Sequence, residues 1–124
     1  ELPYQRLNNQ LFYSIENIIH TTSIRPVLAH VDRYHPDDIA DLMNLPLYAQ
    51  INAESLKERK NRKWLSSYME ADRVVGFGSD LHGAEKDALK GYLKGLSKIG
   101  SKKEERVNAF AASFLKNAER LNKI

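Results

Sequence analysis

The sequence has no cysteine, which excludes both a disulfide framework and a thiolate metal site. No low-complexity tract or signal peptide is visible, and no apolar run approaches the roughly 20 residues of a membrane-spanning helix. Neither sign of charge dominates, because 19 basic and 16 acidic residues leave a formal net charge of +3. We therefore expect a cytoplasmic protein without a membrane span, whose 124 residues suffice for one domain with a modest core.

Hydrophobic periodicity, prolines and glycines divide the chain into alternating helices and strands. The strand segments are short and apolar, whereas the helical segments repeat their apolar residues every three or four positions. The pattern predicts helices over about 8–21, 36–44, 58–71, 85–98 and 102–121, and strands over 26–29, 47–52 and 74–78. This alternation indicates an α/β protein with parallel strands.

The two C-terminal helices are expected to pack by apolar faces, while Gly91 and Gly95 are expected to allow close packing and not phosphate binding. The expected face of the helix 85–98 comprises Leu89, Tyr92, Leu93 and Leu96. The expected buried residues of the last helix are Val107, Phe110, Ala111, Phe114 and Leu115.

Candidate ligands follow two of the predicted strands. Asp80 and His82 come just after the apolar run 74–78, and side chains two residues apart on a strand lie on the same face. His30 follows the strand 26–29 in the same way. Ligands of α/β proteins usually bind at the carboxyl ends of the strands, and carboxylate with neutral imidazole is a common ligand mixture for Mn, Fe or Zn. The pattern predicts one shared metal site.

Three short motifs in this order resemble the PHP superfamily. They are Pro26–Tyr34 (PVLAHVDRY), Gln50–Asn52 (QIN) and Gly78–His82 (GSDLH). The most similar members are the bacterial manganese-dependent protein-tyrosine phosphatases of capsule and exopolysaccharide operons. Those proteins carry Ala-His-x-Glu-Arg-Tyr and Ala-Ser-Asp-x-His segments in these places. Their Glu-Phe-Pro segment is matched by the first three residues, Glu-Leu-Pro.

The resemblance implies a distorted (β/α)₇ barrel with two or three divalent ions, most commonly Mn, with Fe, Co or Zn as alternatives. It assigns Glu1, His30, Asp80 and His82 as metal ligands, His82 also being catalytic, and Arg33 as the phosphate-binding catalytic arginine. The His-x-His motif of the family is missing, and so is an arginine that many relatives carry after the last motif. Lys86 stands in that segment.

The 124 residues of the chain are enough for only part of such a barrel. A complete (β/α) barrel typically needs about 250 residues, and three strands are too few to close one. The first residue is Glu and not Met. We therefore expect residues 1–124 to be the C-terminal portion of a single PHP-type barrel domain, with weak or no activity when isolated.

The implied function is a metal-dependent phosphoric monoester hydrolase. The resemblance favours a protein-tyrosine phosphatase acting on a bacterial tyrosine kinase of exopolysaccharide synthesis. Two alternatives stay open: a PHP phosphatase for a small metabolite such as histidinol phosphate, and a non-catalytic module that binds anions through the basic run 57–63. That run is interpreted as a solvated helix face and not as a nucleic-acid site. Self-association is left open.

Structural roles compete with each assignment. Asp80 has the residue type and position of a helix N-cap, with His82 then a surface histidine. His30 has the alternative role of a hydrogen-bonded core histidine, and Glu1 that of a disordered terminus. Arg33 has Asp32 and Asp37 as nearby ion-pair partners in the sequence.

Overall fold

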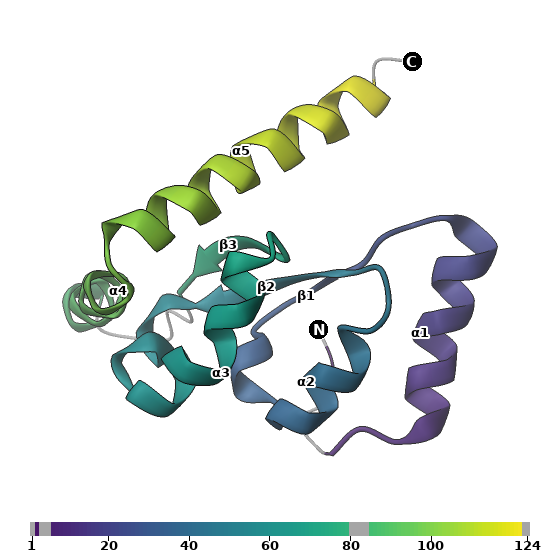
Figure 1. The fold of residues 1–124 in the computed structure, drawn as a ribbon, viewed down its shortest axis with the longest axis horizontal. Helices are drawn as coiled ribbons and strands as arrows, with labels where there is room; N and C mark the ends of the chain where they lie inside the picture. Colours follow the sequence, from purple (N-terminus) through teal and green to yellow (C-terminus); the bar gives the residue numbers. More distant parts are fainter. Residues whose placement is uncertain (1, 3–5, 80–84, 123–124) are drawn as a thin grey trace.

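The strands form one small parallel sheet with helices on both sides (Figure 1). The computed structural model describes residues 2, 6–79 and 85–122. Within it, β1 (Val27–Leu28), β2 (Tyr48–Asn52) and β3 (Val74–Gly78) are hydrogen-bonded in the order β1-β2-β3. Both strand pairs are parallel, which confirms the predicted mixed α/β class.

The helices lie where the periodicity placed them, with ends that differ by about two residues at most. Local signals fix several ends. Asn8 accepts a hydrogen bond from the Leu11 N–H at the start of α1, Pro36 opens α2, and Gly100, with φ +87°, follows α4. None of the described helices combines the length and apolar content needed to cross a membrane. The helical elements are α1 (Asn9–Thr22), η1 (Val31–Arg33), α2 (Pro36–Leu42), η2 (Ala53–Lys57), α3 (Arg59–Glu70), α4 (Glu85–Ile99) and α5 (Ser101–Asn122).

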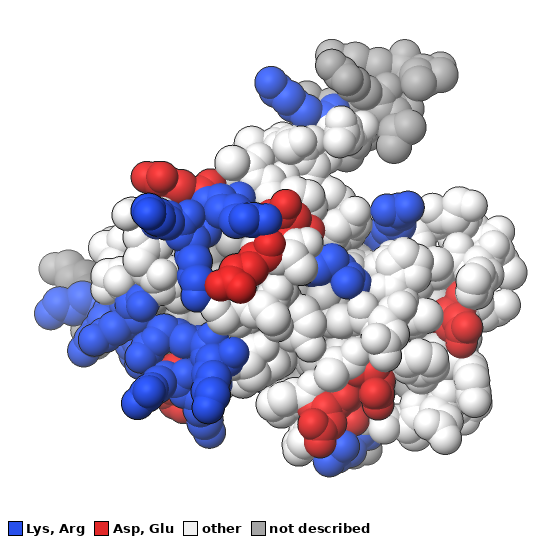
Figure 2. Space-filling model, in the orientation of Figure 1, with Lys and Arg blue, Asp and Glu red and all other residues white. Residues whose placement is uncertain are grey.

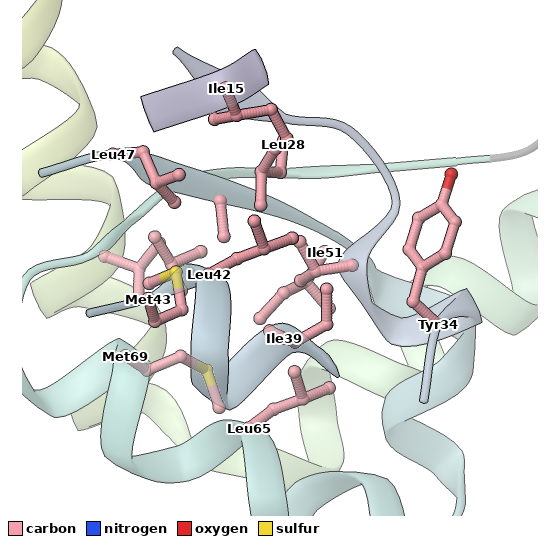
Figure 3. Packing of buried hydrophobic residues seen from close by; sticks show 14 of the residues in the cluster. Ile15, Leu28, Tyr34, Ile39, Leu42, Met43, Leu47, Ile51, Leu65 and Met69 are labelled. Carbon is pink, nitrogen blue, oxygen red and sulfur yellow. The ribbon is translucent and has the colours of Figure 1, made fainter. Parts of the chain in front are cut away.

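The hydrophobic core lies between the sheet and the helices α2 and α3 (Figure 3). Alternate residues of β2 point into it, and the side chains of Ala49 and Ile51 are completely buried. Helix α1 adds Ile15 and Ile19 at one side. The largest fully buried side chains are Val31, Ile39, Leu42, Leu47, Ile51, Leu56, Leu65, Met69, Val74 and Val107.

Helix α5 contacts the other face of the sheet. Tyr48, at the start of β2, lies 4.9 Å from the ring of Phe114 and 5.9 Å from that of Phe110, measured between ring centroids. Val107 is buried as predicted, whereas Phe110 and Phe114 are only half-buried. The expected burial of Leu115 is wrong, because 62% of this residue is exposed. The sheet is too small to cover the whole length of the helix.

Helix α4 packs by its glycines and by only part of the expected leucine face. A Cβ at position 95 would lie 1.7 Å from the Ala53 carbonyl oxygen of η2, so Gly95 lets the two backbones approach closely. Gly91 is buried against the Glu54 side chain. Of the expected apolar face, Leu96 is buried, whereas Leu89 and Leu93 are each 57% exposed. The close-packing role expected for the two glycines is confirmed.

The N-terminal segment is held to η1 and α2 by polar contacts. The buried Asp38 carboxylate accepts from Arg6 Nε (2.9 Å), Arg6 Nη2 (3.1 Å) and the Leu7 N–H (3.1 Å). The buried Tyr34 hydroxyl donates to the Leu2 carbonyl oxygen (2.6 Å) and accepts from the Leu2 N–H (3.1 Å). These bonds connect residues about 30 apart in the sequence and fix the segment beside the turn that carries Arg33.

We expect Gly95→Ala to destabilise the protein, because its Cβ would collide with backbone atoms of Ala53 in η2. The free energy of unfolding should fall by on the order of 2–3 kcal/mol in urea denaturation followed by circular dichroism. Gly91→Ala is the matched control. Its Cβ would meet only the Glu54 side chain, at 3.1 Å, and Ala favours the helix, so stability should hold or rise slightly. Equal stability of the two variants would contradict the packing.

We expect Asp38→Asn to lower the free energy of unfolding at pH 7 by on the order of 1–2 kcal/mol, because it removes a charge-assisted acceptor. The Arg6 hydrogen bond holds the pKa of Asp38 below its ordinary value of 3.8. A lowered folded-state pKa contributes stability above the unfolded-state pKa, and this contribution disappears as the pH falls through the folded value. Urea denaturation at pH 7 and pH 2.5 should therefore show a stability difference that shrinks in acid. An equal difference at both pH values would argue against the ionised pair.

Candidate functional site

His30 occupies a strained position two residues after β1. Its backbone is left-handed, with φ 55° and ψ 45°, a region that a residue with a Cβ enters at an energetic cost. The His30 N–H donates to Gln50 Oε1 at 2.8 Å, and the His30 carbonyl oxygen accepts from the Arg33 N–H at 3.0 Å. Asn or Gly would adopt this conformation more easily, so we infer that the imidazole itself is the reason for His at this position.

A hydrogen bond to Asn52 sets the tautomer of His30. The imidazole Nδ1 lies 2.8 Å from Asn52 Oδ1 at the end of β2. An amide oxygen only accepts, so Nδ1 is the donor in this bond, and in the neutral ring the lone pair is then on Nε2. Histidines that bind metals commonly use one ring nitrogen while the other donates to a carbonyl or carboxylate oxygen. The contact with Asn52 thus favours the tautomer of the neutral His30 ring that an Nε2 ligand requires.

Asn52 also connects β2 to the turn that carries Arg33. Its backbone N–H donates to Asp32 Oδ1 at 2.7 Å, and only 4% of the residue is exposed. Both of these groups of Asn52 therefore have partners, as buried polar groups generally do. The side chain of Asn52 and its backbone together hold the two ends of the segment from His30 to Asp32.

The end of β3 completes the arrangement. Gly78 is paired with Asn52 in the parallel ladder, and a Cβ at position 78 would lie 1.8 Å from Gln50 Nε2. The absent side chain of Gly78 is therefore what leaves room for Gln50. Asp80 and His82 follow Gly78 by two and four residues in the sequence, and both lie outside the described residues.

A shallow depression of about 360 Å³ opens beside this network. Its walls come from the η1 turn, the end of β2 and the segment between β2 and α3. Arg33 lines the depression and is an exposed residue. The lining residues are Asp32, Arg33, Asn52, Glu54, Ser55, Lys57 and Glu58. Arginine binds phosphate in bidentate geometry, and a depression of this size accommodates a phosphoryl group with part of its carrier.

Two of the five predicted site residues are described, and they lie on one turn. His30 precedes η1 and Arg33 ends it. Glu1, Asp80 and His82 lie outside the described residues, so the shared metal site is not tested by their positions. Among the residues that the structure describes, no three His, Asp or Glu side chains form a group that could hold a metal ion. Of the predicted ligands, the described part therefore contributes the imidazole of His30.

Gln50 and Asn52 were part of a motif in the sequence but were not predicted to have roles in the site. Their signal is the alternation of β2, in which the polar Gln50 and Asn52 alternate with the buried, apolar Ala49 and Ile51. Polar residues on a central strand need hydrogen-bond partners. The nearest candidate ligand, His30, follows the neighbouring strand β1. The sequence alone does not reveal that these partners are the backbone and ring of His30.

Comparisons with known proteins add no relative. No protein-family model and no curated protein matches the sequence, and no solved structure matches the fold.

The tautomer of His30 can be measured directly. Long-range ¹H–¹⁵N spectra of the imidazole rings should show His30 with the proton on Nδ1 at neutral pH. His35 is an internal control, because the opposite tautomer is expected for it. Its Nδ1 accepts from the Asp37 N–H at 3.2 Å, so the proton of the neutral ring lies on Nε2. In Asn52→Ala, His30 should change to the Nε2-protonated form that free imidazole side chains prefer, with His35 unaffected. A His30 spectrum that Asn52→Ala leaves unchanged would contradict the hydrogen bond.

Proposed function

We propose that this chain is the C-terminal part of a PHP-type phosphoesterase, and that it acts as a metal-dependent phosphatase of phosphotyrosine proteins in the cytoplasm. The observation that carries the proposal is the hydrogen bond of His30 Nδ1 to Asn52, which leaves Nε2 for a ligand at the carboxyl ends of parallel strands. This is the ring form and the location that a catalytic metal ligand needs. The resemblance in sequence motifs is the reason for proposing metal-dependent hydrolysis of a phosphate ester.

The remaining ligands in this proposal are Glu1, Asp80 and His82, together with an earlier part of the barrel. Divalent ions held by such a set supply an activated water at neutral pH and neutralise phosphate charge. Arg33 would bind the phosphoryl oxygens of the substrate at the depression beside η1. Asn52 would act as a positioning residue, since it contacts His30 and not the reacting phosphate.

The backbone strain at His30 also supports a functional role. A left-handed residue with a Cβ usually persists only where the surrounding structure fixes it, and here Gln50 and the η1 turn do so. A histidine that served only as a hydrogen-bonded core residue would gain nothing from this conformation. The half-buried imidazole has one described polar contact, to Asn52, which leaves its other nitrogen for a ligand.

Two other functions remain as alternatives. A phosphatase for a small metabolite such as histidinol phosphate would use the same ligands and Arg33, and the open, shallow shape of the depression favours a protein substrate over it. A non-catalytic anion-binding module would depend on the basic run 57–63 and would not need the tautomer of His30.

We expect the complete protein that contains this chain to hydrolyse a phosphotyrosine peptide in the presence of Mn²⁺ and to lose this activity with a chelator. His30→Ala and His82→Ala should each reduce kcat/KM at least about 100-fold, because each removes a metal ligand. Both should keep the wild-type melting temperature within a few degrees. His20→Ala is the matched control, since His20 is exposed at the end of α1. Residues 1–124 alone should show little or no turnover.

Each alternative predicts a different outcome of this assay. Faster turnover of histidinol phosphate than of the peptide would favour the metabolite phosphatase. Metal-independent binding of the peptide without turnover would favour the anion-binding module. Wild-type turnover in His30→Ala would refute the site, and a collapsed melting transition in that variant would assign His30 to the core instead.

A further inference from the structure

The first turns of α3 carry a dense group of positive charges. Between positions 57 and 63 there are five basic residues and one acid, Glu58. We call the basic residues the α3 basic surface; they are Lys57, Arg59, Lys60, Arg62 and Lys63. In Figure 2, Lys and Arg side chains gather at the end of the molecule where Figure 1 shows α3 beginning. This concentration contrasts with the net charge of only +3 for the whole chain.

The charges of this surface are poorly neutralised. Lys57 pairs with Glu54 at 3.3 Å, and Lys60 lies 3.8 Å from Glu58 with both side chains mostly exposed. Exposed pairs of this kind contribute little. Within the described part of the chain, neither Arg59 nor Lys63 has a carboxylate within 4.0 Å.

The position of these charges is unfavourable for the helix itself. The amino end of a helix carries a partial positive charge, which favours acidic residues in the first turn. Helix α2 follows this rule with Asp37 and Asp38, whereas α3 has no acid in its first turn and Glu58 makes no capping hydrogen bond. Helix stability therefore does not explain the basic residues, and a bound anionic group would offset their repulsion.

The surface is continuous with the candidate site. Lys57 and Glu58 line the same depression as Arg33 and Asn52. Arg62 fixes this junction, because its Nη1 donates to the Leu56 and Lys57 carbonyl oxygens at 2.9 and 2.8 Å. The α3 basic surface therefore begins at the edge of the depression that Arg33 lines.

We propose that the α3 basic surface binds acidic side chains that flank the phosphorylated residue of a protein substrate. This proposal rests on the phosphatase function proposed above, because it assigns the substrate's neighbouring residues to a surface beside that site. A nucleic acid fits less well. Trp64 is only partly exposed for stacking on bases.

Arg59→Gln/Lys63→Gln tests the surface, since both residues are exposed and lie on the same side of α3. Arg25→Gln/Lys116→Gln is the matched control, because it removes two exposed cations elsewhere. The first probe is a fluorescent peptide with an unphosphorylated tyrosine and four flanking glutamates, compared with its glutamine counterpart. Anisotropy titration of residues 1–124 should show preferred binding of the glutamate peptide, weakened about five- to tenfold by the α3 pair and unchanged by the control.

Equal binding of the two peptides, or equal loss in both double variants, would overturn the proposal. Tighter binding of a single-stranded oligonucleotide of the same charge would assign the surface to nucleic acid instead. The binding assay needs neither metal nor turnover, so its result stands even if the phosphatase function fails. If the complete protein is active, the α3 pair should raise KM for a glutamate-flanked phosphopeptide without changing kcat, and should leave p-nitrophenyl phosphate hydrolysis unaffected. An unchanged KM would show that the surface does not select the substrate.

Discussion

The hydrogen bond between the Gln50 side chain and the His30 N–H joins the ends of β1 and β2, and the geometry of the candidate site depends on it. Gln50 belongs to β2, and its Oε1 accepts from the His30 N–H beyond β1 at 2.8 Å. Its Nε2 lies 1.8 Å from the place of a Cβ at position 78 in β3, so only glycine leaves room for it there. A larger residue at 78 would displace Gln50 and deprive the left-handed His30 backbone of its acceptor. The position of the imidazole is thus set by a hydrogen bond from the residue after β1 to a side chain of the adjacent strand β2, for which Gly78 of β3 leaves room.

The two faces of β2 have separate functions in this arrangement. Ala49 and Ile51 are completely buried in the core below the sheet, and Gln50 and Asn52 alternate with them on the opposite face. Burying Asn52 costs free energy unless its polar groups are paired, and its hydrogen bonds to His30 and Asp32 meet that requirement. An apolar residue at position 52 would avoid the requirement but would leave the tautomer of His30 unset.

The element pattern could be predicted from the sequence because it follows from local signals. Both ends of the strand 74–78 are predicted correctly, and the ends of the helices are predicted to within about two residues. These ends depend on apolar periodicity and on single residues such as Pro36 and Gly100, which are signals that act over short distances. The burial of individual side chains could not be predicted as well. Leu93 and Leu115 are exposed because close contact at Gly95 and the small area of the sheet determine which helix face is covered. The partners of His30 depend on strand register, including the extra residue of β3 opposite the Ala49–Gln50 step, and register is a long-range property.

The position of helix α5 shows which face of the sheet could point into the proposed barrel. In a closed barrel, helices cover the outer face and alternate strand residues point inward. Because α2 and α3 cover the face of Ala49 and Ile51, the inward face would be that of Tyr48, Gln50 and Asn52. Phe110 and Phe114 of α5 contact this same face at Tyr48, the first residue of β2, whereas Asn52 is the last. At about 3.3 Å per residue, the two ends are about 13 Å apart. Among the described residues, the ring contacts of helix α5 therefore lie at the amino end of the strand and not at its carboxyl end, where Asn52 contacts His30.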